Sequence, residues 1–299
     1  TGVNPHGSGD NKITAIGFSS AYLGCTGVDD SGRYTNIEIC NNTINNVQAY
    51  ERGIALDNFA WGGGSGGEIS GAVIRGNVVN GVSSTPPSFG IRLSGLVTDT
   101  VIEENVITGG DVSVFGTVGF YGGSTAYPVG TLVYYNNFGG NGGGLVWDGS
   151  VLFDARFNWW VAASGPYHAV LSPGGLGDSV SDGVSFAPWY IDAERTTLST
   201  PSVVYVDDDY SSATPGWGYD HFAVIQDAVD AVVDGGTVLV SAGVYYEDQV
   251  TINKGVTVQG DGLASTIIDG GGVTLASAGL VRIVGSGDVT FSGFTVRNA

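Results

Sequence analysis

A six-residue unit recurs five times between residues 39 and 160. Each copy begins and ends with an apolar residue and carries asparagine at its fourth position. Units that return at irregular intervals are typical of a solenoid, in which every turn keeps its strands and varies its loops. The asparagines are Asn42, Asn77, Asn105, Asn136 and Asn158, at intervals of 35, 28, 31 and 22 residues.

The recurring asparagine has a structural explanation. Asparagine tolerates a left-handed turn conformation, and its side chain hydrogen bonds readily to nearby backbone. When strands stack about 4.8 Å apart, amide side chains at equivalent positions can also bond one another as a ladder. We therefore interpret the five asparagines as part of the architecture and not as a ligand site.

The stretch 220–262 predicts the beginning of such a solenoid. Apolar residues recur at helical spacing over 222–234, and Asp220 is a candidate N-cap for this helix. Short β-branched strands separated by glycine and aspartate follow, of which 237–241 is the first. A parallel β-helix needs this combination at its first turn, because the helix covers the open end of the coil.

Two segments resemble known proteins. Residues 220–262 resemble the N-terminal cap and first rungs of the pectin-lyase-like right-handed β-helix superfamily. Residues 154–168 (DARFNWWVAASGPYH) resemble the signature that closes β-helix modules in surface proteins of methanogenic archaea, with Val161 where the usual glycine stands. The resemblance implies an all-β, right-handed parallel β-helix solenoid with one capping helix, in an extracellular or cell-surface protein.

The order of these segments is permuted, because the start of the fold lies near the end of the sequence. We expect 1–189 to form the C-terminal half of a β-helix module, 190–202 to be a linker and 203–299 to form the N-terminal half. The repeat would continue in register from the last strand to the first, so copies of the chain would complete one another head to tail. The residues of this predicted assembly junction are Phe291, Phe294, Val296, Ile13, Ile16 and Phe18.

The formal net charge of −19 limits the partners that the chain can have. Nucleic acids and anionic membranes both attract clusters of Lys and Arg, and the ten basic residues of this chain are scattered. No run of about 18 apolar residues is present, so direct membrane insertion is not expected.

Two covalent features are predicted. Cys25 and Cys40 predict one disulfide, because disulfides are typical of secreted β-proteins. The alternative is two buried free thiols, which pack as small apolar groups. Asn41 begins the sequence Asn-Asn-Thr and is a candidate glycosylation site.

Three adjacent carboxylates follow a short apolar strand at Asp207, Asp208 and Asp209. Adjacent carboxylates repel one another, and a hard cation with oxygen ligands such as Ca²⁺ relieves that repulsion. These residues are therefore candidates for a metal site, although the usual calcium-loop pattern is absent. No other cofactor is expected.

The sequence favours a structural role: a repeat unit of a surface layer, sheath or filament, and not an enzyme. No cluster of catalytic residue types is evident. Arg52, Arg75 and Arg92 could form a stripe across successive rungs, which we interpret as a solvent-exposed surface and not as a catalytic site. A carbohydrate-binding or adhesion module with surface glycans as partner is the first alternative, motivated by Trp61 and Trp147 near glycine-rich loops. A polysaccharide lyase or hydrolase is the second, and glycan binding would separate the alternatives.

Overall fold

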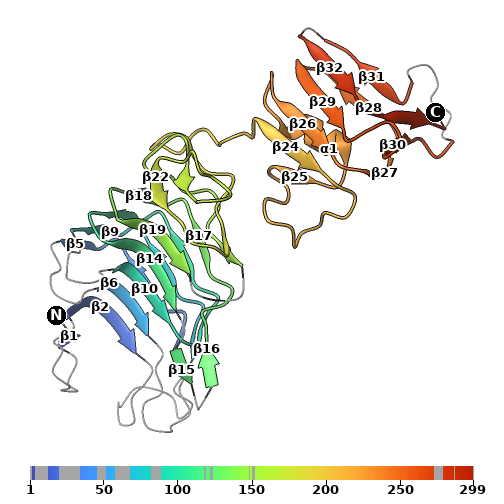
Figure 1. Cartoon of the computed structure of the whole chain (residues 1–299). Coiled ribbons are helices and arrows are strands. Elements are labelled where there is room, and N and C mark those ends of the chain that lie inside the picture. Colours follow the sequence, from blue (N-terminus) through green and yellow to red (C-terminus); the bar gives the residue numbers. More distant parts are fainter. Residues whose placement is uncertain are drawn as a thin grey trace. The chain divides into compact units, whose positions relative to one another are not determined.

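Figure 1 shows a computed structural model of the chain. The structure describes residues 2–3, 13–19, 34–45, 52–57, 68–81, 89–117, 119–121, 124–147, 149, 152–272, 279–285 and 287–298. The chain divides into two compact units, Thr1–Ser199 (unit 1) and Thr200–Ala299 (unit 2). Both consist mainly of short strands stacked in parallel, and the described residues contain a single α-helix. The prediction of an all-β parallel β-helix with one helix is confirmed.

Unit 1 stacks four main sheets around one core. All strand pairs in them are parallel, except that β1 runs antiparallel to β2. Sheet A contains β1 (Gly2–Val3), β2 (Ile13–Ser19), β6 (Arg52–Asp57), β10 (Phe89–Ser94), β14 (Val112–Thr117) and β19 (Gly143–Trp147). Sheet B contains β3 (Tyr34–Thr35), β7 (Ile69–Ser70) and β11 (Val97–Thr98).

The other two main sheets of unit 1 follow directly along each turn of the coil. Sheet C contains β4 (Glu38–Cys40), β8 (Val73–Arg75), β12 (Val101–Glu103), β17 (Leu132–Tyr134), β20 (Phe153–Asp154) and β23 (Val184–Ser185). Sheet D contains β5 (Thr43–Asn45), β9 (Val78–Asn80), β13 (Val106–Thr108) and β18 (Asn137–Gly139). Two small pairs complete the unit: β15 (Gly119–Tyr121) with β16 (Ser124–Ala126), and β21 (Pro166–Tyr167) with β22 (Gly177–Ser179).

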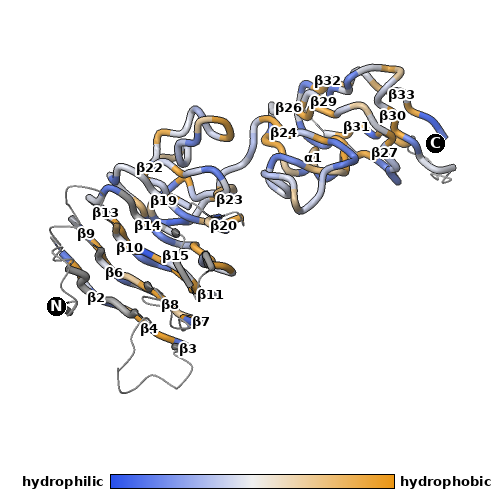
Figure 2. Tube along the Cα trace, turned by 60° about the horizontal axis from the view of Figure 1, so that its bottom comes forward, coloured by the Kyte–Doolittle hydropathy of each residue, from blue (hydrophilic) through white to orange (hydrophobic). Residues whose placement is uncertain are grey.

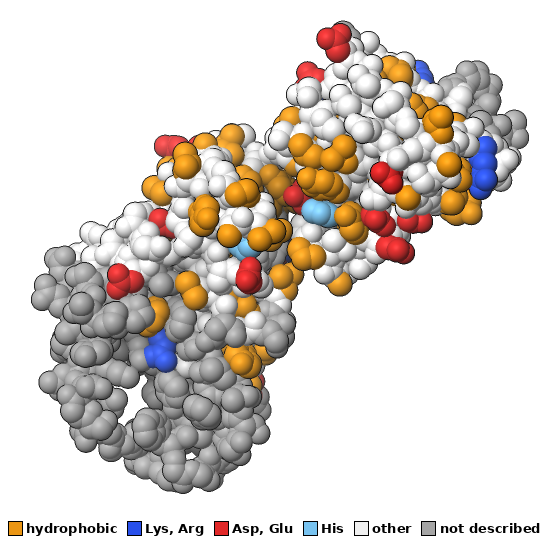
Figure 3. Space-filling view, in the orientation of Figure 1, with side chains coloured by type: hydrophobic (Ala, Val, Ile, Leu, Met, Phe, Trp, Pro, Cys, Tyr) orange, Lys and Arg blue, Asp and Glu red, His pale blue; other side chains and the backbone are white. Residues whose placement is uncertain are grey.

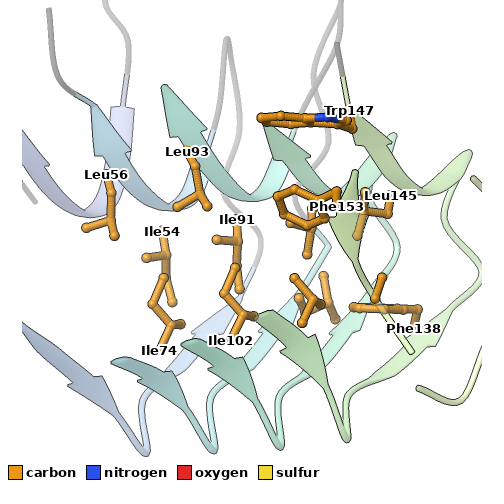
Figure 4. Close-up of a cluster of buried hydrophobic side chains, with 14 of the residues drawn as sticks. Ile54, Leu56, Ile74, Ile91, Leu93, Ile102, Phe138, Leu145, Trp147 and Phe153 are labelled. Atoms are coloured by element: carbon orange, nitrogen blue, oxygen red, sulfur yellow. The ribbon is translucent and has the colours of Figure 1, made fainter. Parts of the chain in front are cut away.

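The alternation of side chains along each strand builds the core. Ile91 and Leu93 of β10 are fully buried, so Arg92 between them points to the outside of the coil. Ile91 pairs with Ile54 one turn earlier, and Figure 4 shows these side chains directed from sheet A toward Ile74 and Ile102 of sheet C. Apolar residues lie along many of the strands (Figure 2). Burying one apolar side chain in the core contributes about 1.5–3 kcal/mol.

The five asparagines form a continuous hydrogen-bonded row at the turn between sheets C and D. Asn42 donates from Nδ2 to Asn77 Oδ1 at 3.0 Å, and Asn77 donates in the same way to Asn105 at 3.0 Å. Asn105 bonds Asn136 at 2.9 Å, and Asn136 bonds Asn158 at 3.0 Å. The last four are fully buried, so the row belongs to the interior of the turn.

The left-handed backbone conformation lies one residue before each asparagine. The interpretation that asparagine itself adopts this conformation is therefore wrong. Its amide bonds the backbone around the turn, and the preceding residue makes the turn. The left-handed residues are Asn41, Gly76, Glu104, Tyr135 and Phe157.

From the sequence, Phe294 and Ile16 occupy the position that asparagine holds in the other copies of the repeat, and for Ile16 this alignment is wrong. Ile16 lies in β2 and pairs with Ile54 of sheet A, whereas the asparagines lie at the turn after sheet C. In unit 2, Phe294 does follow a left-handed residue, Gly293, between two strands. The junction segments therefore occupy different parts of a rung, and the head-to-tail pairing stays a prediction.

The boundary between the units falls inside the segment predicted as a linker, 190–202. The amide of Tyr190 donates to the carbonyl of Asn158 at 2.9 Å, and the amide of Ser199 donates to the carbonyl of Trp189 at 2.7 Å. Residues 190–199 therefore fold back onto unit 1.

Unit 2 has three sheets that repeat the same parallel pairing. Sheet E contains β25 (His221–Phe222), β24 (Val203–Val206), β26 (Thr237–Val240), β29 (Val256–Gly260) and β32 (Val289–Ser292). Sheet F contains β27 (Gly243–Tyr246), β30 (Thr266–Asp269) and β33 (Thr295–Arg297), and sheet G contains β28 (Val250–Ile252) and β31 (Val281–Ile283).

The helix α1 (Ile225–Ala231) is shorter than predicted and is capped differently. Its N-cap is Val224, which has no side chain that can accept a hydrogen bond, so the prediction of Asp220 as N-cap is wrong. The amide of Ile225 instead donates to Oε1 of Glu247 at 2.7 Å. This carboxylate is buried, and burial raises its pKa. Glu247, which lies 22 residues after Ile225, therefore caps the helix, and the sequence around the helix start does not predict this.

Candidate functional site

A row of polar and aromatic side chains runs along the outside of sheet C. Arg75, Glu103 and Tyr134 pair in register on neighbouring strands. The Arg75 guanidinium lies 3.4 Å from the Glu103 carboxylate. Burial and a hydrogen bond to Glu103 raise the pKa of Tyr134 to about 12. The phenol donates its one proton to the Glu103 carboxylate.

The row continues to Arg156. Leu132 pairs with Asp154, which places Arg156 at the level of Tyr134. The Arg156 guanidinium donates to both carboxylate oxygens of Asp154, from Nε at 2.9 Å and from Nη2 at 2.7 Å. This pairing raises the pKa of Arg156. The guanidinium also lies over the Phe157 ring, 5.6 Å from its centre. A two-bond pair of this kind fixes the side chain in one orientation.

Further aromatic rings flank the row at the turn after β17. The ring centres of Tyr134 and Tyr135 are 5.0 Å apart, and Tyr190 lies 6.1 Å from Tyr135. The Arg195 guanidinium donates to the carbonyl of Tyr135 and, at 3.1 Å, to Oδ1 of Asn137. We call these side chains the Arg–Tyr face. It consists of Arg75, Glu103, Tyr134, Tyr135, Arg156, Tyr190 and Arg195.

The Arg–Tyr face has the chemistry of a surface that contacts sugars. It combines the exposed ring of Tyr135 and the half-buried rings of Tyr134 and Tyr190 with charged donors and acceptors, which suits ligands that have apolar faces and many hydroxyl groups. Three of the ten basic residues of the chain lie on it, namely Arg75, Arg156 and Arg195. The predicted stripe of Arg52, Arg75 and Arg92 does not form, because Arg75 lies on sheet C and the other two lie on sheet A.

Sequence reasoning missed this face, although a signal was present. Arg75, Glu103, Tyr134 and Arg156 follow one another at intervals of 28, 31 and 22 residues, so they form no local motif. Each lies two positions before an asparagine of the row: Arg75 before Asn77, and Glu103 before Asn105. Comparing the residue at this position between copies of the repeat would have found the face.

The three consecutive carboxylates of unit 2 lie at a tight turn. Oδ1 of Asp207 accepts a hydrogen bond from the amide of Asp209 at 3.0 Å, which stabilises a tight turn. Within the described ranges, no three His, Cys, Asp or Glu side chains come close enough to hold a metal ion. The hypothesis of a calcium site at Asp207, Asp208 and Asp209 therefore has no geometric support.

The other predicted site residues lie away from the Arg–Tyr face or outside the described residues. Cys40 is a half-buried free cysteine on β4, and its predicted partner Cys25 lies outside the described residues. Asn41 is exposed, and its glycosylation stays a prediction. Trp147 is only 5% exposed and packs in the core (Figure 4), so its interpretation as a surface sugar contact is wrong. Trp61 lies outside the described residues.

Comparison with known proteins finds a similarity to an enzyme. Over 122 residues the chain is 34% identical to a protein described as probable pectinesterase/pectinesterase inhibitor 17 from Arabidopsis thaliana. The match covers 38% of this chain and 22% of the relative, so the chain spans about a fifth of the length of that protein. No family model and no solved structure matches. Across the described residues, no helix combines the length and the hydrophobicity needed to span a membrane.

This similarity contradicts the prediction that the chain is not an enzyme, because the matched relative is one. It favours the polysaccharide-hydrolase alternative over the surface-assembly role. It also agrees with the pectin-lyase-like β-helix that the sequence predicted, whereas the resemblance to archaeal surface proteins gains no support. What the structure and the comparison establish together is a parallel β-helix with partial similarity to a pectinesterase.

Proposed function

We propose that this chain is part of an extracellular enzyme that hydrolyses ester bonds on a uronate polysaccharide, and that the Arg–Tyr face lies against the polymer. The similarity to a pectinesterase carries the proposal, because a β-helix by itself supports many functions. The arrangement of guanidinium, carboxylate and phenol groups along one side of unit 1 gives a surface on which a chain of sugars can lie.

The charge of the protein favours an esterified polymer. An esterified uronate is uncharged, whereas the hydrolysed product carries one negative charge per sugar. A protein of net charge −19, whose visible surface carries scattered acidic groups (Figure 3), repels the product more than the substrate. This preference should weaken with salt, because the Debye length falls to about 8 Å at physiological ionic strength.

Glu103 is the side chain of this face that we assign to the chemistry. Ester hydrolysis needs a nucleophile or a base and a group that stabilises the negative charge of the intermediate. The Glu103 carboxylate lies between the guanidinium of Arg75 and the phenol of Tyr134. As a base, the carboxylate takes a proton from a water molecule whose oxygen attacks the ester carbonyl carbon, and the Arg75 guanidinium donates to the oxyanion that forms. When this intermediate collapses, the C–O bond to the alcohol breaks and Glu103 returns the proton to the departing alcohol.

The test is acid release from highly esterified pectin by the purified full chain, followed by titration at constant pH. We expect Glu103→Gln to lower the rate at least tenfold, whereas Glu38→Gln, an exposed glutamate on β4 of the same sheet, should leave the rate unchanged. The absence of any acid release above the blank would refute the proposed activity.

A binding measurement tests the role of the face separately. Retardation of the chain in gels containing esterified pectin should exceed retardation in gels containing polygalacturonate. Arg156→Gln should reduce the retardation, whereas Arg282→Gln, an exposed arginine of unit 2, should not. Equal retardation of both variants would place the polymer on another surface.

A further inference from the structure

A second group of aromatic side chains lies at one edge of sheet E in unit 2. The imidazole of His221 stacks on Tyr205, with ring centres 5.1 Å apart and an interplanar angle of 28°. The Tyr210 ring lies 5.0 Å from the same imidazole. Nδ1 of His221 is 2.8 Å from Oδ1 of Asp220. Three rings and one carboxylate thus converge on a small area.

The loop before β25 holds this group in place. The amides of Asp220 and His221 both donate to the carbonyl of Gly216, at 3.1 and 3.2 Å. Gly216 has a φ of +83°, and a Cβ atom there would lie 2.1 Å from Oδ1 of Asp220 and 2.7 Å from Nδ1 of His221. Only glycine allows the loop to close so tightly. The Asp220–His221 pair is therefore positioned before any ligand arrives, which lowers the cost of binding.

The group is open to solvent. Tyr205 and Trp217 are each 41% exposed. Trp217 also pairs with His221 through a backbone bridge, so this residue belongs to the same short loop. The surface continues along the stacked strands, where Leu239 and then Gln259 occupy the register position of Tyr205. Aromatic rings exposed beside hydrogen-bonding groups offer both a stacking surface and polar contacts.

The charge of this area differs from that of the Arg–Tyr face. Burial raises the pKa of Tyr210, and the nearby Asp207, Tyr205 and Asp220 raise it further. The group contains carboxylates and no Lys or Arg, so it disfavours an anionic ligand. A neutral sugar fits this chemistry, because its apolar face can stack on an aromatic ring while its hydroxyl groups donate to a carboxylate.

We propose that Tyr205, Trp217 and the Asp220–His221 pair form a binding site for neutral oligosaccharides, separate from the Arg–Tyr face of unit 1. This site does not depend on the proposed ester hydrolysis, because it lies in the other unit and shares no residue with the Arg–Tyr face. A polysaccharide with both uronate and neutral segments could then be recognised through two kinds of contact.

The test is calorimetric titration of the full chain with cellohexaose, xylohexaose, mannohexaose and galactohexaose, with trigalacturonate as the anionic probe. We expect at least one neutral hexasaccharide to bind and trigalacturonate not to compete for its site. Tyr205→Thr and Trp217→Ala should each weaken binding at least tenfold, the loss typical of a central aromatic contact. Tyr246→Ala, which removes a 76% exposed tyrosine of β27 in the same unit, should change the affinity less than twofold.

A measurement on the unmodified chain tests the proposal even if the variants fail to fold. The bound hexasaccharide should shift the imidazole NMR signals of His221, which is one of three histidines in the chain. No binding of any neutral hexasaccharide, binding that Tyr205→Thr leaves intact, or displacement by trigalacturonate would each overturn the proposal. Glu103→Gln should lower the rate of ester hydrolysis at least tenfold and leave this binding unchanged, so the two proposals can fail separately.

Discussion

The asparagine row allows a quantitative prediction about the stability of unit 1. The side-chain amide of Asn105 makes five hydrogen bonds: it donates to Asn136 Oδ1 and to the carbonyls of Ile74 and Glu103, and it accepts from the amide and the Nδ2 of Asn77. Asn105 and Asn77 are fully buried, so water cannot replace these bonds. We therefore predict that Asn105→Ala is strongly destabilising.

The magnitude follows from the groups that lose a partner. The buried amide of Asn77 loses its acceptor, and a buried group left without a partner costs about 1–3 kcal/mol. The carbonyl of Ile74 loses a donor at similar cost, and each remaining bond contributes about 0.5–1.5 kcal/mol. We expect Asn105→Ala to lower the free energy of unfolding by about 4 kcal/mol, at the upper end of single substitutions.

Asn42→Ala is the matched control. It is the same substitution at the first asparagine of the row, where the side chain is only half-buried and donates to Asn77 Oδ1 and to the carbonyl of Cys40. Water can reach this end of the row, so the loss should be about 1 kcal/mol. Urea unfolding followed by tryptophan fluorescence measures both values. Equal losses would refute the argument, because they would show that burial of the row does not determine its contribution.

Three further predictions concern single positions. Val161→Gly should raise the melting temperature of unit 1, because Val161 has a φ of +65°, a conformation that costs a β-branched residue about 1–2 kcal/mol; a lower melting temperature would contradict this. Gly116→Ala should lower the free energy of unfolding by about 1–3 kcal/mol, since the new Cβ would lie 2.4 Å from the buried ring of Trp147; an unchanged urea midpoint would show that the ring can move. The pKa of Asp269 is lowered to about 2, chiefly by a hydrogen bond from Asn298, so its contribution to stability is present above about pH 4 and is lost as the pH falls through 2. Asp269→Asn should therefore reduce the loss of stability between these pH values, as measured by acid titration of the circular dichroism signal, and an unaltered acid transition would contradict it.

The strands and their stacking could be predicted from sequence because the rung repeats. Apolar positions such as Ile74 and Ile102 recur with asparagine three positions later, and this pattern survives changes in loop length. The register of Ile13–Ser19 could not be predicted, because its apolar residues also fit the asparagine-containing unit of sheets C and D. Only its pairing with β6 shows that the segment belongs to sheet A. The prediction of the α1 cap failed for a related reason, since Glu247 follows β27 and lies 22 residues after Ile225.

The candidate sites were harder to predict than the fold. Asp207, Asp208 and Asp209 looked like a site because they are adjacent in sequence, yet they make a turn. Arg75 and Glu103 form an ion pair although they are 28 residues apart. In a solenoid, residues that meet on the surface lie one rung apart, so proximity in sequence is a poor guide to a site.

The asparagine row also explains why functional residues can collect beside it. Each asparagine donates to the carbonyl of the residue two positions earlier, as Asn77 does to Arg75 at 3.1 Å and Asn136 does to Tyr134 at 2.9 Å. The asparagine side chain donates this bond and the earlier residue contributes only its backbone carbonyl, so any side chain is compatible at that earlier position. The five residues at this position are all exposed or half-buried and differ widely in chemistry, while the asparagines do not vary. They are Cys40, Arg75, Glu103, Tyr134 and Arg156. The same contact that fixes the turn therefore leaves the neighbouring surface position free to acquire a function.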